Sequence, residues 1–256
     1  MRCGGETPRA PYDGLQPTLR NSFVTTAPLQ TQTAALHRTW WWGFLPFAVV
    51  SAVHIGARAA VAPEIAEPTK LALMPLLAVA AVWGGRGGRT GLPTALLLGA
   101  LLFSWLGDGA AAFFPFAPEL PVMLGSFGLA HLCYIWLLTR YTAANPFPRW
   151  ALVFAAWWVL MLLVLWPTLG GLAFAVAAYG IVLAGTAATA ARCSRTVALG
   201  GILFLASDTV LALRIFMPEA MPGWTNPLVM LTYCAGQGLI VAGVLRTRAT
   251  RRPVSA

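Results

Sequence analysis

Residues 149–166 read RWALVFAAWWVLMLLVLW, a stretch in which only the first residue carries a charge. A helix needs about 20 consecutive apolar residues to cross the hydrocarbon core of a bilayer. Between Trp40 and Leu245 the chain is a series of such stretches, separated by short segments in which Pro, Gly and Arg gather. The sequence therefore predicts an all-α, polytopic membrane protein.

The composition of the chain supports the same class. Of its 256 residues, 58% are hydrophobic and 10% are charged, whereas a soluble domain carries about 25% charged residues. This balance excludes a disordered protein and an ordinary water-soluble globule. The four cysteines show no spacing of the CxxC type, so we expect neither a metal site of that kind nor a framework of disulfides.

Seven clusters of Pro, Gly and Arg divide the apolar region into eight predicted helices. Their approximate ranges are 40–60, 69–83, 92–112, 120–140, 149–166, 170–191, 197–217 and 227–246. Residues 1–39 are polar and lack the short apolar core of a signal peptide, so they are predicted to form a disordered tail. The predicted domains are this tail, an eight-helix transmembrane domain over residues 40–246, and a basic tail over residues 247–256.

The basic residues predict how the helices are oriented. Most of the 17 Lys and Arg residues lie on one side of the predicted bundle, together with both termini. They are Arg2, Arg9, Arg20, Arg38, Arg86, Arg89, Arg140, Arg149, Arg192, Arg195, Arg246, Arg248, Arg251 and Arg252. By the positive-inside rule this side is cytoplasmic, so we expect a multi-pass protein of the cell (inner) membrane. The same rule accounts for the net charge of +9 without a nucleic-acid partner.

Two carboxylates lie inside predicted helices, where charge is unfavourable. An Asp at the centre of a membrane helix costs about 2.5–3.5 kcal/mol on insertion scales. Asp108 ends the sequence LLFSWLGD, which begins at Leu101, and Asp208 ends ILFLASD, which begins at Ile202. Four helices separate the two segments, which are either a parallel repeat or a chance similarity between apolar runs. Pairing with a basic residue would explain either Asp, and hydration would explain Asp108, but a functional role is favoured for both.

Other polar side chains are predicted at a similar depth in neighbouring helices. Lys70 begins the second predicted helix and His131 lies near the middle of the fourth, so one cavity could hold both beside the two Asp residues. Further hydroxyl and amide groups are Ser104, Tyr134, Ser207, Tyr233 and Gln237. Each of these could instead make an interhelical hydrogen bond worth about 0.6 kcal/mol. Lys70 could extend to the membrane interface, and His54 is interpreted as structural.

Five segments of the chain occur in an order that resembles a known family. They are Glu67–Pro75 (EPTKLALMP), Leu101–Asp108, Gly125–Tyr134 (GSFGLAHLCY), Ile202–Asp208 and Thr232–Ile240 (TYCAGQGLI). Together they resemble the YhhN-like lysoplasmalogenase family of multi-pass membrane hydrolases, over about residues 40–246. The resemblance implies functional roles for Lys70, Ser104, Gly107, Asp108, Phe127, His131, Tyr134, Ser207, Asp208, Tyr233 and Gln237.

The resemblance also implies an activity, which is hydrolysis of the vinyl-ether bond of a lysoplasmalogen to a fatty aldehyde and a glycerophospho-ethanolamine or -choline. A vinyl ether is cleaved when its β-carbon is protonated and water adds to the resulting oxocarbenium-like cation. We therefore expect Asp108 and Asp208 to be catalytic, one as general acid and the other as stabiliser of the cation and base for water. Lys70 or His131 would hold phosphate or tune the pair. Besides the ether-lipid substrate within the membrane, no cofactor, metal or obligatory protein partner is expected.

Two other functions fit part of the pattern. A zinc-dependent intramembrane lipid hydrolase would need about three His ligands, whereas only His54 and His131 are predicted within the membrane. A proton-coupled transporter or a lipid-binding membrane protein could also use a pair of Asp residues at mid-depth. Turnover by the purified protein without any gradient distinguishes a hydrolase from a transporter.

Overall fold

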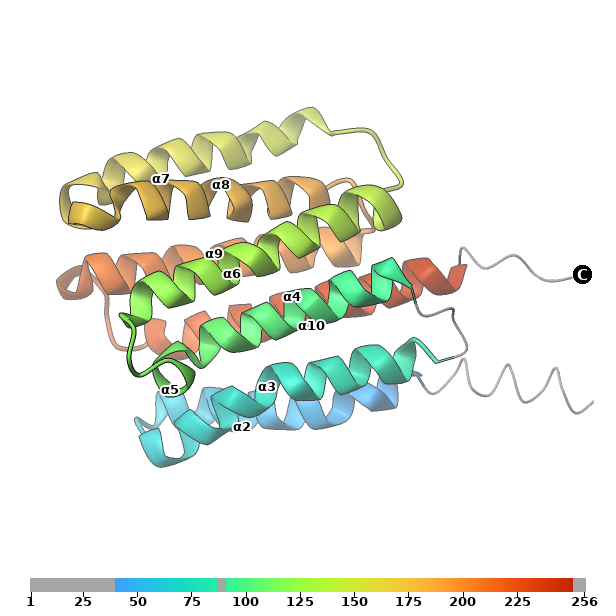
Figure 1. Ribbon diagram of the computed structural model, residues 1–256, viewed down its shortest axis with the longest axis horizontal. Coiled ribbons are helices and arrows are strands. Elements are labelled where there is room, and N and C mark those ends of the chain that lie inside the picture. Colours follow the sequence, from blue (N-terminus) through green and yellow to red (C-terminus); the bar gives the residue numbers. More distant parts are fainter. Residues whose placement is uncertain (1–39, 87–90, 251–256) are drawn as a thin grey trace, which may run out of the picture. The chain divides into compact units, whose positions relative to one another are not determined.

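The computed structural model describes residues 40–86 and 91–250, and every element within these ranges is helical (Figure 1). The prediction of an all-α protein is confirmed. The predicted tail over residues 1–39 lies outside the described residues, as do residues 87–90 and 251–256.

Eight long helices make up the described chain. They are α2 (Leu45–Ala59), α3 (Pro63–Gly84), α4 (Leu92–Asp108), α6 (Glu119–Leu137), α7 (Val153–Leu169), α8 (Ala173–Ala190), α9 (Arg195–Phe216) and α10 (Thr225–Thr250). The short helix α5 (Ala110–Phe113) follows α4. Short helical turns adjoin several of these helices, namely η1 (Trp40–Phe44) before α2, η2 (Leu138–Thr142) after α6, η3 (Arg149–Leu152) before α7, η4 (Gly170–Leu172) between α7 and α8, and η5 (Pro218–Ala220) after α9. Helix α10 continues through the first four residues of the predicted tail 247–256.

Six helical stretches among the described residues are long and apolar enough to cross a membrane. One of them, Arg149–Ala190, spans 42 residues and contains both α7 and α8. The chain reverses direction between these two helices near Gly170, whose φ is +52°. Helix α4 has 17 residues and is not among the six. Each of the eight predicted ranges overlaps one long helix, while the number that cross a membrane stays a prediction.

Two of the helix boundaries that differ from the predicted ones affect candidate site residues. Helix α3 begins at Pro63 and not at residue 69, because proline fits the first position of a helix, where its missing N–H needs no partner. Lys70 therefore lies about two turns inside the helix. Helix α4 ends at Asp108, because Gly109 leaves the helical conformation with φ −98° and ψ 17°. The prediction of one helix over residues 92–112 is therefore wrong, and Asp108 is the last residue of α4.

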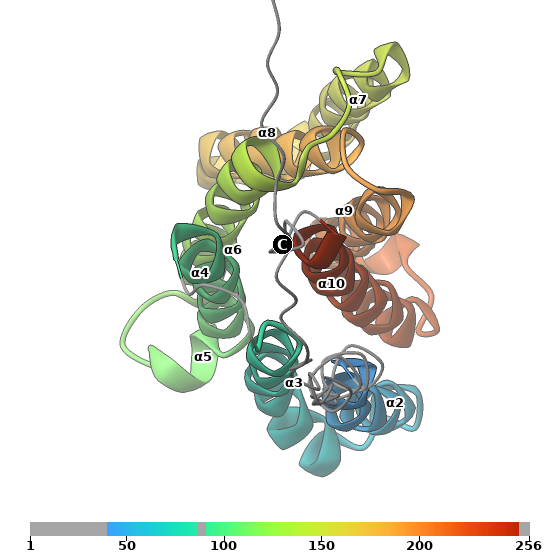
Figure 2. The same cartoon turned by 90° about the vertical axis from the view of Figure 1, so that its right-hand side faces the viewer.

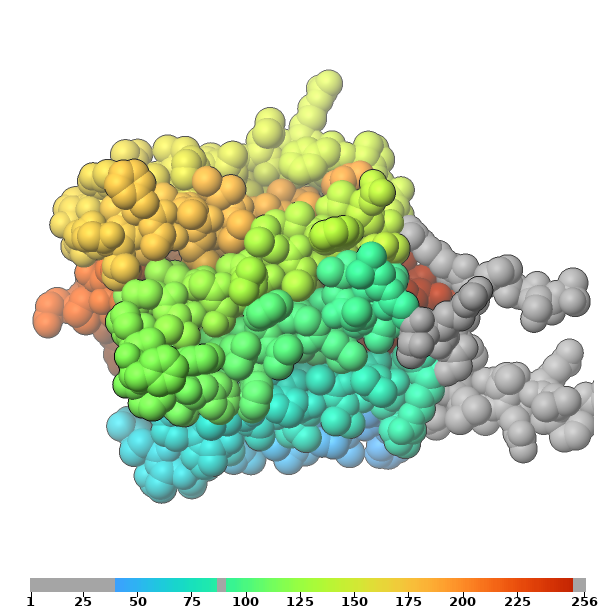
Figure 3. All heavy atoms as spheres, in the orientation of Figure 1, coloured from blue at the N-terminus to red at the C-terminus, as the bar shows by residue number. Residues whose placement is uncertain are grey.

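The contacts between neighbouring helices join seven of the long helices into a closed ring, whose arrangement can be followed in the view along the helix axes (Figure 2). Neighbours pack in the order α2, α3, α4, α6, α8, α9 and α10, and α10 closes the ring by packing against α2 and α3. Helix α7 lies outside the ring against α8 and α9. In the space-filling view α6 and α4 lie directly against each other (Figure 3). The ring therefore brings helices from both halves of the chain to one interior.

The charged residues separate toward the two ends of this bundle. Helix α2 begins and α10 ends at the same end (Figure 1). The described basic residues near that end are Arg86, Arg140, Arg149, Arg192, Arg195, Arg246 and Arg248. Arg58, Lys70 and Arg214 lie toward the opposite end. The predicted orientation depends on this separation, and which end faces the cytoplasm stays a prediction.

Helices α9 and α10 approach so closely that their backbones touch. A Cβ atom on Gly200 would lie 2.8 Å from the backbone nitrogen of Ile240 and 2.9 Å from the carbonyl oxygen of Gly236. A Cβ atom on Gly236 would lie 2.8 Å from the backbone nitrogen of Phe204. Only glycine permits this separation, so these residues hold the two helices in one register.

Gly200→Ala is expected to destabilise the protein by about 1–3 kcal/mol, because the backbone atoms of α10 cannot move aside without parting the helices. The matched control is Gly128→Ala in α6, where nothing lies within 4 Å of the added Cβ atom. This control should be neutral or stabilising, because Ala favours a helix over Gly by about 1 kcal/mol. Thermal unfolding in detergent measures both variants, and equal melting temperatures would contradict the backbone contact.

Candidate functional site

A polar cavity of about 440 Å³ lies toward the end of the bundle opposite the one where α2 begins and α10 ends. Its walls come from α2, α3, α6, α9 and α10. Of the predicted site residues, Lys70, Ser207, Asp208 and Tyr233 line it. Ring closure brings them together, because they lie on helices that are far apart in the sequence. Of the four residues predicted to share one cavity, Lys70 and Asp208 line this one, and Asp108 and His131 do not.

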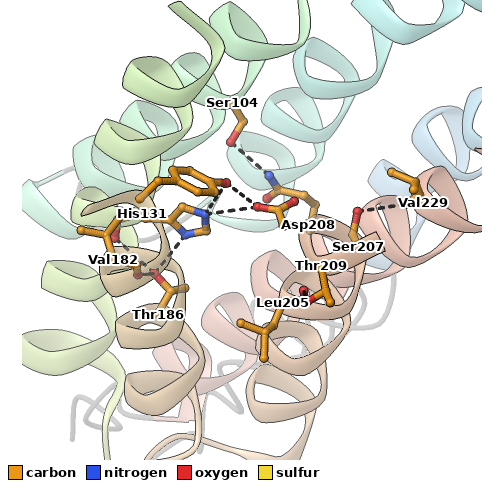
Figure 4. Close-up of polar contacts among 11 residues, drawn as sticks. Ser104, His131, Val182, Thr186, Leu205, Ser207, Asp208, Thr209 and Val229 are labelled. Carbon is orange, nitrogen blue, oxygen red and sulfur yellow. Dashed lines mark hydrogen bonds and ion pairs between the residues drawn. The ribbon is translucent and has the colours of Figure 1, made fainter. Parts of the chain in front are cut away.

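Asp208 is buried on α9 and contacts side chains of two neighbouring helices, α8 and α6. The hydroxyl group of Tyr179, on α8, donates a hydrogen bond to Oδ2 of Asp208. Nε2 of His131, on α6, lies 3.8 Å from the same oxygen and 3.3 Å from the hydroxyl of Tyr179. Figure 4 shows the imidazole ring of His131 directed at Asp208. The three side chains therefore form one hydrogen-bonding group.

The other ring nitrogen of His131, Nδ1, contacts the hydroxyl group of Thr186 on α8. Thr186 donates its hydroxyl proton to the carbonyl oxygen of Val182, at 3.0 Å. Its oxygen then accepts a hydrogen bond from Nδ1 of His131, also at 3.0 Å (Figure 4). The hydroxyl of Tyr179 donates its own proton to Asp208, so its oxygen can accept a hydrogen bond from Nε2 as well. Nε2, the Tyr179 hydroxyl and the Asp208 carboxyl can therefore share a proton.

Asp108 has a similar set of contacts from other helices. The hydroxyl of Tyr233, on α10, donates a hydrogen bond of 2.7 Å to Oδ2 of Asp108. Asp108 also interacts electrostatically with Lys70 on α3 and with Asp208. It is half-buried and is not part of the wall of the polar cavity, whereas Tyr233 is. Asp108 is therefore connected to the cavity by its hydrogen bond with the phenol of Tyr233.

The two carboxylates have partners on corresponding helices. Asp108 is on the third long helix, and its partners Lys70 and Tyr233 are on the second and the eighth. Asp208 is on the seventh, and its partners Tyr179 and His131 are on the sixth and the fourth. If the eight long helices are numbered as a cycle, in which the first follows the eighth, adding four to each number converts one set into the other. This match favours a parallel repeat over chance similarity of the two Asp-containing segments.

Three further predicted residues form a fully buried chain of hydrogen bonds. The hydroxyl of Tyr134, on α6, donates to Oε1 of Gln237 on α10. Nε2 of Gln237 donates to the hydroxyl oxygen of Ser104 on α4, at 3.1 Å. None of the three lines the polar cavity. The chain ties α4, α6 and α10 together, and it thereby sets the positions of Asp108 and Tyr233.

Two other polar residues at the cavity are held by backbone carbonyls. Ser207 donates a hydrogen bond of 3.0 Å to the carbonyl oxygen of Val229 on α10. Nδ1 of His54 lies 3.1 Å from the carbonyl oxygen of Ala66 and 3.0 Å from Oγ1 of Thr69, both on α3. The contacts of His54 agree with its interpretation as a residue that joins two helices.

Tyr179 and Thr186 are site residues that the sequence did not predict. Tyr179 is half-buried on the Ala-rich helix α8, and Thr186 lies seven residues further on, which places both on one helix face. A phenol in the middle of an apolar helix is the one sequence signal that singles out Tyr179. Nothing in the sequence distinguishes Thr186 from a threonine that bonds only to its own helix.

A second, apolar groove lies on the other side of Asp208. It has a volume of about 50 Å³ and runs between α7, α8 and α9. Its walls include Trp157, Trp158 and Met161, and both Tyr179 and Asp208 line it as well. Asp208 is therefore shared between a polar cavity and an apolar groove.

The ring of Phe127 lies against Gly107, next to Asp108. A Cβ atom on Gly107 would lie 2.6 Å from Cδ2 of Phe127. Phe127 also lines the polar cavity and makes an edge contact with Tyr233, with ring centroids 6.1 Å apart. Any side chain at Gly107 would therefore push an aromatic ring toward the cavity and disturb the phenol that Asp108 holds.

Gly107→Ala is expected to lower turnover at least about tenfold, because a displacement near 1 Å at a site can cost that much or more. The matched control is Gly99→Ala, two turns earlier on α4, where the nearest atom to the added Cβ would be Sγ of Cys133 at an ordinary 3.6 Å. The rate of the catalysed reaction is measured for both variants after their melting temperatures have been compared. Equal rates would show that Phe127 moves without consequence.

Among residues 40–86 and 91–250, no group of three or more His, Cys, Asp and Glu side chains is arranged to hold a metal ion. His54 and His131, the two histidines on which a zinc site would depend, bond to α3 and to α8 and α9 respectively. The donor set in the described residues therefore does not match the three-ligand site of a zinc-dependent lipid hydrolase.

Comparison with known proteins supplies one match. The model of the YhhN family matches residues 66–244, a range that contains every site residue described above except His54. No curated protein and no solved structure matches the chain.

Proposed function

The chain belongs to the YhhN family, and on that premise we propose that it is a membrane-embedded hydrolase that cleaves the vinyl-ether bond of lysoplasmalogens. The products are a fatty aldehyde and a glycerophospho-ethanolamine or -choline. The observation that carries the proposal is the position of Asp208, which borders a polar cavity and an apolar groove. A lysolipid has a polar head and one hydrocarbon chain, and its ether bond lies where the two meet.

The proposed reaction uses the two carboxylates in turn. The Asp208 carboxyl group donates its proton to the β-carbon of the vinyl ether, which leaves an oxocarbenium-like cation beside the carboxylate. Asp108, with the phenol of Tyr233, takes a proton from water as the water oxygen bonds to that cation. The hemiacetal then breaks its bond to the glycerol oxygen, which takes the proton that Asp108 received from water. The hemiacetal hydroxyl gives its own proton to Asp208 as the aldehyde carbonyl forms. One water is consumed and the protonation of the site is restored.

The neighbouring groups have supporting roles in this proposal. Nε2 of His131 and the hydroxyl of Tyr179 form a route by which Asp208 regains a proton. Thr186 keeps the proton of the imidazole on Nδ1, so that Nε2 stays directed at Asp208. Ser104, Tyr134 and Gln237 position the helices that carry Asp108 and Tyr233.

Purified protein in detergent, without any gradient, tests the proposal when it is given alkenyl, alkyl and acyl lysolipids with one head group. Aldehyde should form from the alkenyl lipid, and neither of the other two should be consumed. Preferred release of a fatty acid from the acyl lipid would identify a lysophospholipase. Binding without turnover of any of the three would support the transporter or lipid-binding function.

We place the protein in the cell (inner) membrane with eight spans and with both termini in the cytoplasm. The support for this is the gathering of basic residues at the end of the bundle where α2 begins and α10 ends. The polar cavity then opens away from the cytoplasm. An impermeant thiol reagent should label Gly223→Cys in whole cells and should label Arg192→Cys only after lysis. The reverse pattern would invert the orientation.

A further inference from the structure

Three cationic side chains line the polar cavity, and the proposed reaction gives none of them a role. They are Arg58 on α2, Lys70 on α3 and Arg214 on α9. Besides Asp208, the lining contains one other carboxylate, which is the exposed Glu119. The wall of the cavity therefore carries an excess of positive charge at the end where it lies nearest the bundle surface.

Neutral acceptors at the start of α10 orient the two guanidinium groups. Arg58 donates to Oδ1 of Asn226 from Nη2 at 2.7 Å and from Nε at 3.2 Å. Arg214 donates from Nη1 to Oγ1 of Thr225 and, at 3.4 Å, to the carbonyl oxygen of Pro222. These contacts hold the side chains in place without neutralising them. Such an arrangement suits an anion that arrives from outside the chain.

The nearest carboxylate to Arg58 does little to compensate its charge. Oε1 of Glu67 lies 3.9 Å from Nη1 of Arg58, and the Glu67 side chain is 71% exposed. Ion pairs of this length and exposure contribute little. Within the described part of the chain, Lys70 makes neither a hydrogen bond nor an ion pair and interacts electrostatically with Asp108. The positive charge at the cavity is therefore available to a ligand.

His54 supplies an independent sign that the cavity takes a ligand. Only 1% of the residue is exposed, it lines the cavity, and its Nε2 has no hydrogen-bond partner. Because a carbonyl oxygen can only accept, the contact between Nδ1 and Ala66 places the proton on Nδ1. Nε2 is therefore a buried lone pair without a donor, which is unfavourable until a hydroxyl or another donor reaches it.

His54 and Arg58 are separated by four residues on α2, so they share a face and lie about 6 Å apart along the helix axis. Arg58 is nearer the end of the helix, and His54 lies one turn deeper in the bundle. A ligand that fits these two side chains carries an anion at Arg58 and, further toward the interior, a hydroxyl at His54. A glycerophosphate whose second carbon is unacylated has its groups in this order. The vinyl ether follows on the adjacent glycerol carbon.

We propose that this end of the cavity recognises a glycerophosphodiester with a free sn-2 hydroxyl, held by Arg58 and Arg214 at the phosphate and by Nε2 of His54 at the hydroxyl. The proposal rests on the proposed function, since it places the ether bond at Asp208. Recognition of the hydroxyl would make the protein select lysolipids over lipids with two chains. His54 is thus a residue that determines specificity as well as one that joins two helices.

Steady-state kinetics with three vinyl-ether substrates test the proposal. They are the lysoplasmalogen, its 2-deoxy analogue and the 1-alkenylglycerol that lacks the phosphate. Arg58→Met and Arg214→Met should each raise KM about tenfold or more for the two phosphorylated substrates and leave the KM for the alkenylglycerol unchanged. His54→Phe should raise KM for the substrates that carry the hydroxyl and should not change it for the 2-deoxy analogue. Equal changes for all three substrates would overturn the proposal.

The matched control is Arg195→Met, which removes an exposed arginine from the other end of α9. It should leave all three KM values unchanged, and a change like that of Arg214→Met would show a general effect of charge. Arg58→Lys is the conservative variant if Arg58→Met fails to fold. It keeps the charge and loses the paired donors, so the proposal requires a KM for phosphorylated substrates above that of the wild type.

Binding without turnover separates failure of this proposal from failure of the proposed function. A saturated 1-alkyl lysophospholipid has no bond for the reaction to cleave and should raise the melting temperature of the wild type, but not of Arg58→Met. If this occurs without hydrolysis of any lipid, the recognition site stands and the proposed reaction fails. If lysoplasmalogen is hydrolysed while Arg58→Met binds and reacts normally, the recognition site fails alone. Equal protection by inorganic phosphate and by the lipid would identify a free-phosphate site and overturn recognition of a lipid head group.

Discussion

Asp208→Asn is expected to lower the turnover of a lysoplasmalogen by about 10²- to 10⁴-fold, the usual range for loss of a general acid. Asn has nearly the same shape as Asp, and its amide oxygen can still accept the hydrogen bond from Tyr179. It has no carboxyl proton to give to the β-carbon. The measurement is the single-turnover rate of aldehyde formation, with the melting temperature of the variant determined in parallel.

Thr209→Val is the matched control for this variant. Thr209 is the next residue on α9 and lines the apolar groove, and its hydroxyl oxygen accepts a hydrogen bond of 3.1 Å from Trp157. Its loss should change stability and leave most of the turnover. Near-normal turnover in Asp208→Asn would remove Asp208 from the chemistry. A large loss of melting temperature with retained activity would assign it to packing.

The double variant Asp108→Asn/Asp208→Asn should be little slower than the slower single variant. Each single change should remove most of the activity, because the two carboxylates act on one intermediate and either is ineffective without the other. Residues that act as a unit are strongly non-additive. The comparison uses the rates of both single variants and of the double variant with one substrate, at equal amounts of folded protein.

Multiplicative losses in that comparison would mean that Asp108 and Asp208 contribute independently. Tyr233→Phe provides a further check, because it removes the hydrogen bond to Asp108 and leaves both carboxylates in place. If Asp108 acts through this phenol, Tyr233→Phe should resemble Asp108→Asn, and combining the two should cause little further loss. If Asp108 has only a packing role, both Tyr233→Phe and Asp108→Asn should retain near-normal turnover.

The sequence predicted the helices well because their physical cause is local. Pro, Gly and Arg interrupt apolar runs, and each predicted range overlaps one long helix. The ends were harder to place, since Gly109 ends α4 while Pro68 and Pro75 lie inside α3. Whether a proline ends a helix or is accepted by it depends on neighbouring helices that can satisfy the freed carbonyl groups. That information is not local.

The candidate site was predicted in part, for a related reason. A charged side chain within a membrane helix is unfavourable in free energy and therefore rare, so Asp108 and Asp208 could be identified from the sequence on this ground alone. Tyr179 and Thr186 were missed because a membrane helix is apolar all round, and its pattern does not say which face turns inward. The sequence did not indicate Arg58 or Arg214 as site residues. Their roles depend on α10 closing the ring against α2, which brings Asn226 to Arg58.

The position of Asp208 between the two spaces has a consequence for what happens after the bond is broken. A fatty aldehyde dissolves in hydrocarbon, and the apolar groove lies beside α7, at the outside of the ring. A glycerophospho alcohol dissolves in water and faces the polar cavity. Cleavage at Asp208 would therefore release the two halves into different phases in opposite directions. The reverse reaction would require the aldehyde and the alcohol to return to the site at the same time. Partition of the two products between lipid and water, and not a gate in the protein, would therefore make the cleavage irreversible.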